Sequence, residues 1–416
     1  MLIPLKKVLM VAYHYPPLSD AGVFRTLKFT KYLPRFGYQP YVLTVKNSMY
    51  GTKDPTLLKE IPPEVEIFRT FSFEHRILRA PRLLKIDLKW FYVPDVNIGW
   101  LPFAVSAGAK IIKEKNIDLV YATSPVWTSL LIGFLLKKKT KKPLVVDFRD
   151  PWTDNPFTEY PTKFHKAIEK KMEEKVLKSA DHIITTTEPM TLKLIDKYPF
   201  TKGKCTTLTN GFDSEDFKNL RRNDYGERFT ITYVGQLYEL RSSRYFLTAI
   251  KELLEEKREL RRNVQALFVG HSGKETKDLV KEYELQDIVK LVGYVAHKRS
   301  LEFMINSDVL LLLIASEEAI EEKMGPPMVP GKLYEYLAAK RPILALIPEG
   351  AAANIVRSTK SGNVIPPEEI NSIKQAILNF LQEWKRGSLG EPQSDIIKYD
   401  RKALTEKLAK IFSICV

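Results

Sequence analysis

Short runs of consecutive apolar residues alternate with longer amphipathic stretches along most of the chain. Residues 8–13 and 41–45 have the length of buried strands, and the amphipathic stretch between them ends near Phe36. A strand, a helix and a second strand in this order predict a βαβ unit. The same alternation predicts more strands, at 118–123, 143–147, 182–187, 229–235, 264–270, 288–292, 308–314 and 343–347, and more helices, at 126–138, 164–178, 189–198, 243–258, 276–284 and 299–306. We therefore expect an α/β protein with parallel sheets.

The pattern also indicates a junction between two domains. A chain of 416 residues has the length of two ordinary domains. Asn210-Gly211 is a strong turn signal, and the strand pattern starts again at Phe229. We therefore expect one α/β domain on each side of this turn.

Residues 329–346 combine a loop, a short helix and a buried strand. Pro342 ends the helix, and its start at Gly331 and Lys332 suits an anion, because free N–H groups and the helix dipole favour negative charge there. Glu335 lies one turn further on and offers an acceptor for hydroxyl groups beside that anion. Phosphate next to a ribose diol is what a nucleotide sugar presents. The alternative is a surface Glu on an ordinary helix.

Glycines stand at the ends of predicted strands in the second half of the chain, at Gly235, Gly270 and Gly293. A residue without a side chain lets a ligand approach the backbone closely. Arg241 and Arg244 follow the first of these glycines, and a guanidinium can bind diphosphate oxygens through two hydrogen bonds. Isolated surface arginines are common, so it is their position after Gly235 that favours a phosphate site.

Polar and aromatic residues also follow a predicted strand in the first half. The run from Asp147 to Trp152 places two acids, Arg149 and an indole at the carboxyl end of a strand, where ligands bind in α/β sheets. We expect Asp150, Arg149 and Trp152 to contact a polar substrate such as a sugar, with Asp150 as the main candidate. The alternative for Asp147 and Arg149 is a buried ion pair that fixes the loop. The turn at Gly22, after the first strand, would line the same edge.

Residues 71–100 interrupt the alternation with a basic and apolar segment. Within 76–92, arginines and lysines recur at three- and four-residue intervals among leucines, with aromatic residues on both sides. Such a segment can rest on an anionic bilayer, although Pro81 would kink or divide its helix. A solvated basic face over the core explains the same pattern equally well.

Composition narrows the class of protein. The net charge of +15 favours anionic partners such as nucleotides, nucleic acid or an anionic membrane surface. The chain has no nucleic-acid recognition motif, and no apolar run reaches the roughly eighteen residues of a membrane-spanning helix. The N-terminus lacks the features of a signal peptide, and Cys205 and Cys415 define neither a disulfide framework nor a metal site. We therefore expect a soluble cytoplasmic protein without a nucleic-acid partner.

An ordered set of motifs resembles the retaining glycosyltransferases of family 4. Residues 233–237, 269–273, 292–295 and 332–342 follow the order and spacing of that family. Asn210-Gly-Phe-Asp213 with Phe217 looks like its interdomain signature, and residues 16–22 resemble its N-terminal glycine loop. The resemblance spans nearly the whole chain.

The resemblance implies the GT-B architecture, an α/β fold in which two Rossmann-like domains face each other across a central cleft. The N-terminal, acceptor-side domain would span 1–203, and the nucleotide-sugar-binding domain would span 204–396. A helix within 397–416 would pack back onto the N-terminal domain.

The resemblance also implies roles for single residues of the donor site. Glu335 would bind the ribose hydroxyls, and the backbone N–H groups of Gly331, Lys332 and Leu333 would hold the diphosphate. Arg241 would neutralise the leaving group.

Further residues would complete the site by the same resemblance. Gly293, Tyr294 and Val295 would lie along the base, while Gly22 and Gly235 would approach the phosphates or the sugar. Arg244 would add positive charge. No Asp-x-Asp motif occurs, so we expect neither a metal nor another cofactor beyond the nucleotide-sugar co-substrate.

The chain departs from the family pattern at defined positions. Pro327 stands eight residues before Glu335, where the family has a first Glu, and Gln236 stands where an Arg is usual. Residues 123–125 and Arg149-Asp150 occupy regions where the family often has a His. The expectation for the sugar-binding part of the site is therefore less specific than that for the nucleotide-binding part.

Together these features predict a retaining, hexosyltransferase-type glycosyltransferase that acts on a lipid-linked or surface-glycan acceptor, at the cytoplasmic face of the membrane. Two alternatives stay open: a sugar-nucleotide 2-epimerase with the same architecture, and a catalytically silent sugar-nucleotide-binding subunit of a glycan-assembly complex.

Overall fold

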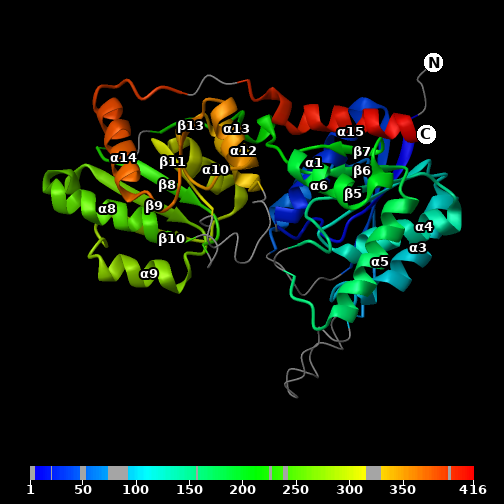
Figure 1. Cartoon of the computed structure of the whole chain (residues 1–416). Helices are drawn as coiled ribbons and strands as arrows, with labels where there is room; N and C mark the ends of the chain where they lie inside the picture. Colours follow the sequence, from blue (N-terminus) through cyan, green and yellow to red (C-terminus); the bar gives the residue numbers. More distant parts are fainter. Residues whose placement is uncertain are drawn as a thin grey trace. The chain divides into compact units, whose positions relative to one another are not determined.

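The computed structural model describes residues 5–19, 21–46, 53–73, 92–155, 158–223, 227–237, 242–314, 329–391 and 395–416 (Figure 1). The chain forms two compact units. Unit 1 comprises Met1–Asn210 and Arg401–Val416, and unit 2 comprises Gly211–Asp400. Both divisions fall a few residues after the boundaries expected from the sequence.

Unit 1 is built on a parallel sheet with the strand order β3-β2-β1-β4-β5-β6-β7 among the described residues. Its strands are β1 (Lys6–Val11), β2 (Tyr38–Val45), β3 (Glu66–Thr70), β4 (Leu119–Thr123), β5 (Leu144–Phe148), β6 (His182–Thr185) and β7 (Cys205–Thr207). Its helices are α1 (Ala21–Tyr32), α3 (Leu101–Glu114), α4 (Trp127–Thr140), α5 (Lys163–Ser179), α6 (Glu188–Lys197) and α15 (Arg401–Cys415). The strand order reverses between β1 and β4, and such a reversal is where α/β sheets bind ligands.

Helices cover both faces of this sheet. Leu9 and Val11 of β1 belong to the core beneath α3, α4 and α5. Val8 and Met10 point to the opposite face and belong to the core beneath α1 and α15. In Figure 1 the C-terminal helix α15, in red, lies beside α1. A strand buried on both faces has an unbroken apolar sequence, which explains why the pattern of β1 was easy to recognise.

Unit 2 repeats this architecture with the parallel order β10-β9-β8-β11-β12-β13. Its strands are β8 (Phe229–Val234), β9 (Val264–Val269), β10 (Val289–Gly293), β11 (Val309–Leu313), β12 (Ile343–Leu346) and β13 (Gly362–Ile365). Its helices are α7 (Ser214–Phe217), α8 (Arg244–Glu256), α9 (Gly273–Glu282), α10 (His297–Asn306), α12 (Gly331–Ala339), α13 (Ala351–Ser358) and α14 (Ile370–Lys385). Here the order reverses between β8 and β11.

The two faces of the second sheet are again covered by helices. Phe246 of α8, Leu279 of α9 and Ile377 of α14 belong to one core cluster. Met304 of α10, Leu333 of α12 and Val356 of α13 belong to the cluster on the other face. The predicted α/β fold with parallel sheets is therefore confirmed, and the predicted strands and helices in the described residues lie within a few positions of those observed.

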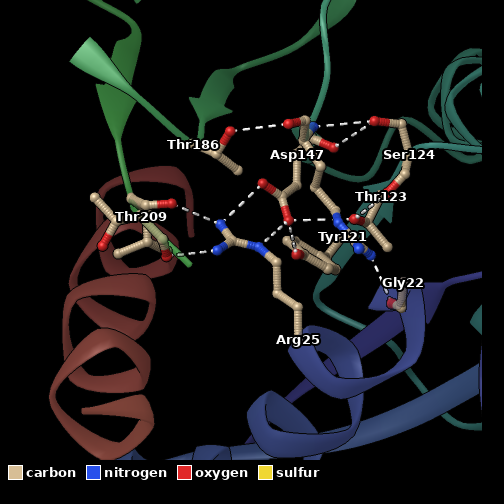
Figure 2. A network of polar contacts seen from close by, with 10 residues as sticks. Gly22, Arg25, Tyr121, Thr123, Ser124, Asp147, Thr186 and Thr209 are labelled. Carbon is tan, nitrogen blue, oxygen red and sulfur yellow. Dashed lines mark hydrogen bonds and ion pairs between the residues drawn. The ribbon is translucent and has the colours of Figure 1, made fainter. Parts of the chain in front are cut away.

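A buried ion pair connects the central elements of unit 1 (Figure 2). Arg25 of α1 donates through Nε and Nη2 to the carboxylate of Asp147 at the end of β5, at 2.7 and 3.0 Å. Arg25 is 1% exposed, and Asp147 is fully buried. The Tyr121 hydroxyl of β4 donates to the same carboxylate at 2.5 Å, and Thr123 donates to it at 3.2 Å. The network therefore joins α1 to two neighbouring strands.

The Arg25 guanidinium also binds the backbone near the end of the first half of the chain. It donates to the carbonyl oxygens of Thr209 and Leu208, at 2.7 and 2.9 Å. Burial lowers the pKa of Arg25, but the Asp147 carboxylate more than reverses this, so its pKa lies above the ordinary value and the guanidinium stays charged. Burial raises the pKa of Tyr121 well above its usual range, so the phenol keeps the proton that it donates.

We predict that Arg25→Met lowers the free energy of unfolding by about 3–5 kcal/mol, because it leaves Asp147 as an uncompensated buried charge. Urea unfolding measures the change. The additional substitution Asp147→Asn should recover part of the loss by removing that charge.

Lys28→Met on the same helix is the matched control. Lys28 pairs with Glu60 at 2.8 Å, and Glu60 is 30% exposed, so water can hydrate the remaining carboxylate. Equal losses for Arg25→Met and Lys28→Met would contradict the central place of the Arg25–Asp147 pair.

Candidate functional site

Helix α12 begins at the reversal point of the second sheet, because one of its side chains ties it to the central strands. The Tyr336 hydroxyl accepts from the backbone N–H of Val234 at 2.9 Å and donates to the carbonyl oxygen of Leu311 at 3.2 Å. Leu333 is fully buried beneath the same helix. These contacts hold the first turn of α12 near the carboxyl ends of β8 and β11.

The start of α12 has the features of an anion site. Pro330 precedes the helix in an extended conformation and makes no side-chain cap. A methyl group added to Gly331 would meet no atom within 4 Å, so a ligand can approach the backbone there. Backbone N–H groups and the helix dipole both favour negative charge at such an end.

The Lys332 side chain lies over Gly235, the residue that follows β8. A methyl group added to Gly235 would come within 2.8 Å of the Lys332 Nζ atom. Gly235 itself lies close to Gly270, where an added methyl group would be 2.1 Å from the Gly235 carbonyl oxygen. Both glycines have φ values in the range that favours glycine, 153° and 124°. The absence of side chains therefore lets a lysine amine reach the end of the central strand.

Glu335 lies one turn further along α12 and contacts a histidine from α10. The His297 Nε2 atom and the Glu335 Oε1 atom are 2.8 Å apart. The two side chains are 17% and 21% exposed, so both are largely enclosed and still open to solvent. Sequence patterns missed His297, since its partner lies on a different helix.

The loop from β10 to α10 carries the residues expected along the base. The Gly293 carbonyl oxygen accepts from the Gly270 N–H at 2.8 Å, which fixes the loop against the end of β9. The Tyr294 side chain is 64% exposed, whereas Val295 packs against the core. The loop ends at His297, the first residue of α10.

Of the two arginines expected in this region, only Arg244 lies in the described residues. Arg244 begins α8 and pairs with Glu275 of α9 at 2.9 Å, with half of its side chain exposed. Arg241 and the loop that contains Pro327 lie outside the described residues, so their predicted roles stay predictions.

In unit 1, Arg149 and Gly22 contact each other directly. The Arg149 guanidinium donates to the Gly22 carbonyl oxygen at 2.6 Å (Figure 2). Gly22 lies against His14, since a methyl group added to Gly22 would come within 3.1 Å of the imidazole. The Ser124 hydroxyl accepts from the Arg149 N–H at 3.0 Å. The structure therefore brings the ends of β1, β4 and β5 together at the reversal point of the first sheet.

Buried charges dominate this region. Burial lowers the pKa of Arg149, even though Asp147 acts in the opposite direction. Burial raises the pKa of Asp150, with Arg149 lowering it and Asp147 raising it. A carboxyl group with a raised pKa holds a proton more readily than a surface acid does.

Trp152 does not reach a substrate surface, which corrects the expected contact with the acceptor. Its side chain is 1% exposed and stacks on Trp127, with ring centroids 5.3 Å apart and planes at 4°. Its Nε1 atom donates to Glu169 at 2.9 Å. Burial raises the pKa of Glu169 to about 7, and the hydrogen bond from Trp152 partly offsets this. The indole thus supports the loop from inside the core.

Two kinds of structure are absent from the described ranges. None of their helices has the length and apolar character needed to cross a membrane. In the same ranges, His, Cys, Asp and Glu side chains form no group of three that could hold a metal ion.

Comparison with protein families gives two adjoining matches. Residues 24–216 match the family described as Glycosyltransferase Family 4, and residues 214–403 match Glycosyl transferases group 1. Together the two matches span most of both units. A comparison with curated protein sequences gives no significant match.

Solved structures with a similar fold cover nearly the whole chain. Sucrose-phosphate synthase from Thermosynechococcus elongatus is 15% identical over 98% of both chains, with a TM-score of 0.67. WaaG, a glycosyltransferase involved in lipopolysaccharide biosynthesis, is 15% identical over 97% of this chain and 99% of its own, with a TM-score of 0.63. A variant of S. aureus TarM in complex with fondaparinux, α-GlcNAc-glycerol and UDP is 10% identical over 98% and 100%, with a TM-score of 0.62. At these identities the likeness supports the fold.

The two family matches and the two-sheet architecture thus agree with each other. The chain is a family 4-like glycosyltransferase of the GT-B fold.

Proposed function

We propose that this glycosyltransferase moves a hexose from a nucleotide-sugar donor to a lipid-linked or surface-glycan acceptor, with retention of configuration at the anomeric carbon. The observation that carries the proposal is the first turn of α12. It combines an open helix start at Gly331, the Lys332 amine over Gly235, and the Glu335 carboxylate one turn later. These groups suit a diphosphate and a neighbouring ribose.

Each part of the donor would meet a group of matching chemistry. The N–H groups at the start of α12 and the Lys332 amine would bind the diphosphate oxygens. The Glu335 carboxylate would accept hydrogen bonds from the ribose hydroxyls. Gly293, Tyr294 and Val295 would lie along the base, with the exposed Tyr294 ring available for stacking.

Positive charge at the same place would stabilise the departing nucleoside diphosphate. As the bond from the anomeric carbon to the diphosphate breaks, negative charge gathers on the phosphate oxygens, and the sugar gains oxocarbenium character. Lys332, the helix start and, by family resemblance, Arg241 would offset that charge. We therefore propose a reaction that needs no metal ion.

The acceptor side of the reaction would use the end of the first sheet. Asp150 lies after β5, and burial raises its pKa, so its ionised carboxylate would be a stronger base that takes the proton from an acceptor hydroxyl. Arg149 would keep the Gly22 turn in place through its bond to the carbonyl oxygen. Trp152 would act only through packing.

A surface cluster of phenylalanines supports a location at the membrane. Phe71, Phe73 and Phe103 contact one another edge to face, with ring centroids 5.0–5.3 Å apart. Phe71 and Phe73 are 48% and 46% exposed. The basic segment at 76–92 follows them in the chain, and its residues 76–91 lie outside the described residues. Aromatic and basic residues together favour the interface of an anionic bilayer, so we propose peripheral binding to the cytoplasmic face.

Two of the similar solved structures agree with this choice of substrates. The S. aureus TarM structure contains UDP and α-GlcNAc-glycerol, and WaaG is involved in lipopolysaccharide biosynthesis. These ligands and this pathway belong to TarM and WaaG. They support a nucleotide-sugar donor and a glycan acceptor as the first ones to test.

The experiment for the proposed function is a thermal-shift screen with UDP-, GDP-, dTDP- and CMP-sugars, followed by product analysis. A bound donor raises the unfolding temperature by mass action. Glu335→Ala should then weaken binding of the selected donor about 10- to 100-fold, because a hydrogen bond to a charged group is lost. Isothermal titration measures the affinity.

Product analysis separates the alternatives. Sugar transfer to an acceptor supports the proposal, whereas an epimerised free sugar formed without an acceptor supports a 2-epimerase. Donor binding without hydrolysis or transfer would identify a silent binding subunit. An unchanged affinity in Glu335→Ala would remove this residue from the site.

A second prediction concerns the contact between Lys332 and Gly235. Lys332→Ala should weaken nucleoside-diphosphate binding about tenfold and leave binding of the free nucleoside nearly unchanged, because only the phosphates contact the amine. Gly235→Ala should have a similar effect, since its methyl group would displace the amine. The double variant should be little weaker than either single variant.

Lys340→Ala is the control for this pair, because Lys340 is exposed at the opposite end of α12. Equal weakening of nucleoside and nucleoside-diphosphate binding in Lys332→Ala would show that the substitution disturbs the fold of the site and would contradict a direct phosphate contact.

A third prediction tests the phenylalanine cluster. Replacing Phe71, Phe73 and Phe103 with Ser should reduce binding to phosphatidylglycerol-containing vesicles about tenfold or more, because the lost apolar surface no longer enters the bilayer. Vesicle co-sedimentation measures the effect.

Leu192→Ser, at a 60% exposed position of α6, controls for the loss of surface apolar area elsewhere in unit 1. Equal binding of wild type and the triple variant, at unchanged thermal stability, would exclude this cluster as a membrane contact.

A further inference from the structure

We infer that His297 is a positioning residue for nucleotide recognition: its imidazole holds the Glu335 carboxylate in the orientation that receives the ribose diol. The inference rests on the proposed function, because it assumes that Glu335 binds ribose. It adds a residue from α10 to a site expected mainly on α12.

The contact between the two side chains has the geometry of a charge-assisted hydrogen bond. The distance of 2.8 Å joins the His297 Nε2 atom to the Glu335 Oε1 atom. An ionised carboxylate only accepts hydrogen bonds, so Nε2 is the donor. Such a bond is stronger than one between neutral groups and restricts the rotation of the glutamate side chain.

Both partners come from fixed backbone positions. The His297 carbonyl oxygen accepts from the Ser300 hydroxyl at 2.7 Å, and the Ser300 N–H donates to Ala296 at 3.0 Å, so the first turn of α10 is well formed. On the other side, the bonds of Tyr336 and the buried Leu333 hold α12. The pair therefore links two anchored helix starts.

The partial exposure of the pair separates it from a structural ion pair. Glu335 is 21% exposed and His297 17%, whereas the Arg25 and Asp147 side chains of unit 1 are 1% and 0% exposed. A carboxylate has lone pairs for about four hydrogen bonds. Glu335 can thus accept from His297 and from ribose hydroxyls at the same time.

Orientation before binding would improve the affinity for the ligand. A glutamate that rotates freely must become ordered when ribose binds, and the cost of ordering one such side chain corresponds to about a two- to tenfold loss of affinity. The bond to His297 removes much of this cost in advance. His297 also lies two residues after Val295 in the chain. A movement of the Gly293–Val295 loop would therefore move the imidazole that orients the Glu335 carboxylate.

The experiment compares ligands with and without the ribose hydroxyls. Isothermal titration would use UDP and its 2′,3′-dideoxy analogue, with the corresponding GDP pair in parallel. We expect His297→Ala to weaken binding of the ribonucleotide about two- to tenfold and to leave binding of the dideoxy analogue unchanged. His297→Gln should restore most of the affinity, because its amide nitrogen can donate to the same carboxylate oxygen.

Lys298→Ala is the matched control, since Lys298 is the exposed neighbour of His297 in the same turn of α10. It should change neither affinity. Circular dichroism and the unfolding temperature verify that each variant is folded, and His297→Phe, whose ring cannot donate to the carboxylate, carries the test if His297→Ala is unstable.

Each other outcome overturns a defined part of the inference. Equal weakening for the ribonucleotide and the dideoxy analogue would assign His297 a general structural role, and no weakening would remove it from the site. If the wild-type protein binds neither UDP nor GDP nor any nucleotide sugar of the thermal-shift screen, the proposed function fails together with the inference. If the wild-type protein prefers ribonucleotides and His297→Ala keeps that preference in full, only the inference fails.

Discussion

The Arg25–Asp147 pair connects the elements on which the first sheet's ligand edge depends. Arg25 contributes from α1, Asp147 from the end of β5, and the guanidinium also reaches the carbonyl oxygens of Leu208 and Thr209. A buried pair of this kind adds little net stability, because desolvation opposes the attraction between the charges, but its loss is costly. Its main effect is therefore to permit one arrangement of helix and strands. Arg149 follows two residues after Asp147, so the position of the proposed acceptor edge depends on the same contact.

Unit 2 places its chemistry by a different physical means, namely close packing without side chains. Gly235 and Gly270 approach so closely that a methyl group on Gly270 would overlap the Gly235 carbonyl oxygen. This packing leaves no side chain over the end of β8, and the Lys332 amine occupies that space. Tyr336 sets the distance of α12 from the sheet through its bonds to β8 and β11. The shape of the candidate donor site thus results from two glycines and one tyrosine.

The sequence predicted those parts whose cause is local. Strands buried on both faces appear as apolar runs, and the start of α12 is marked by Pro330 and Gly331. The edge strand β3 and the short strand β13 were missed, because they are only partly buried and carry polar residues. Trp152 was expected at the surface, since residue type cannot reveal that its indole stacks on Trp127 within the core. His297 was missed because its contact with Glu335 joins residues 38 positions apart. In the sequence, a role for His297 in the site was indicated only by its position two residues after the Gly293–Val295 loop.

Burial distinguishes the charges that hold each unit together from those that can serve a ligand. Arg25 and Asp147 satisfy each other away from water, and a charge enclosed in this way has no capacity left for a substrate. Glu335 and His297 are close enough to bond and still partly exposed, so their pairing orients a carboxylate that solvent or a diol can reach. Two sheets of the same topology therefore use charged residues in opposite ways at their reversal points. In the first sheet the charges fix the backbone, and in the second they stay available at the start of a helix, which is why we assign the donor to unit 2.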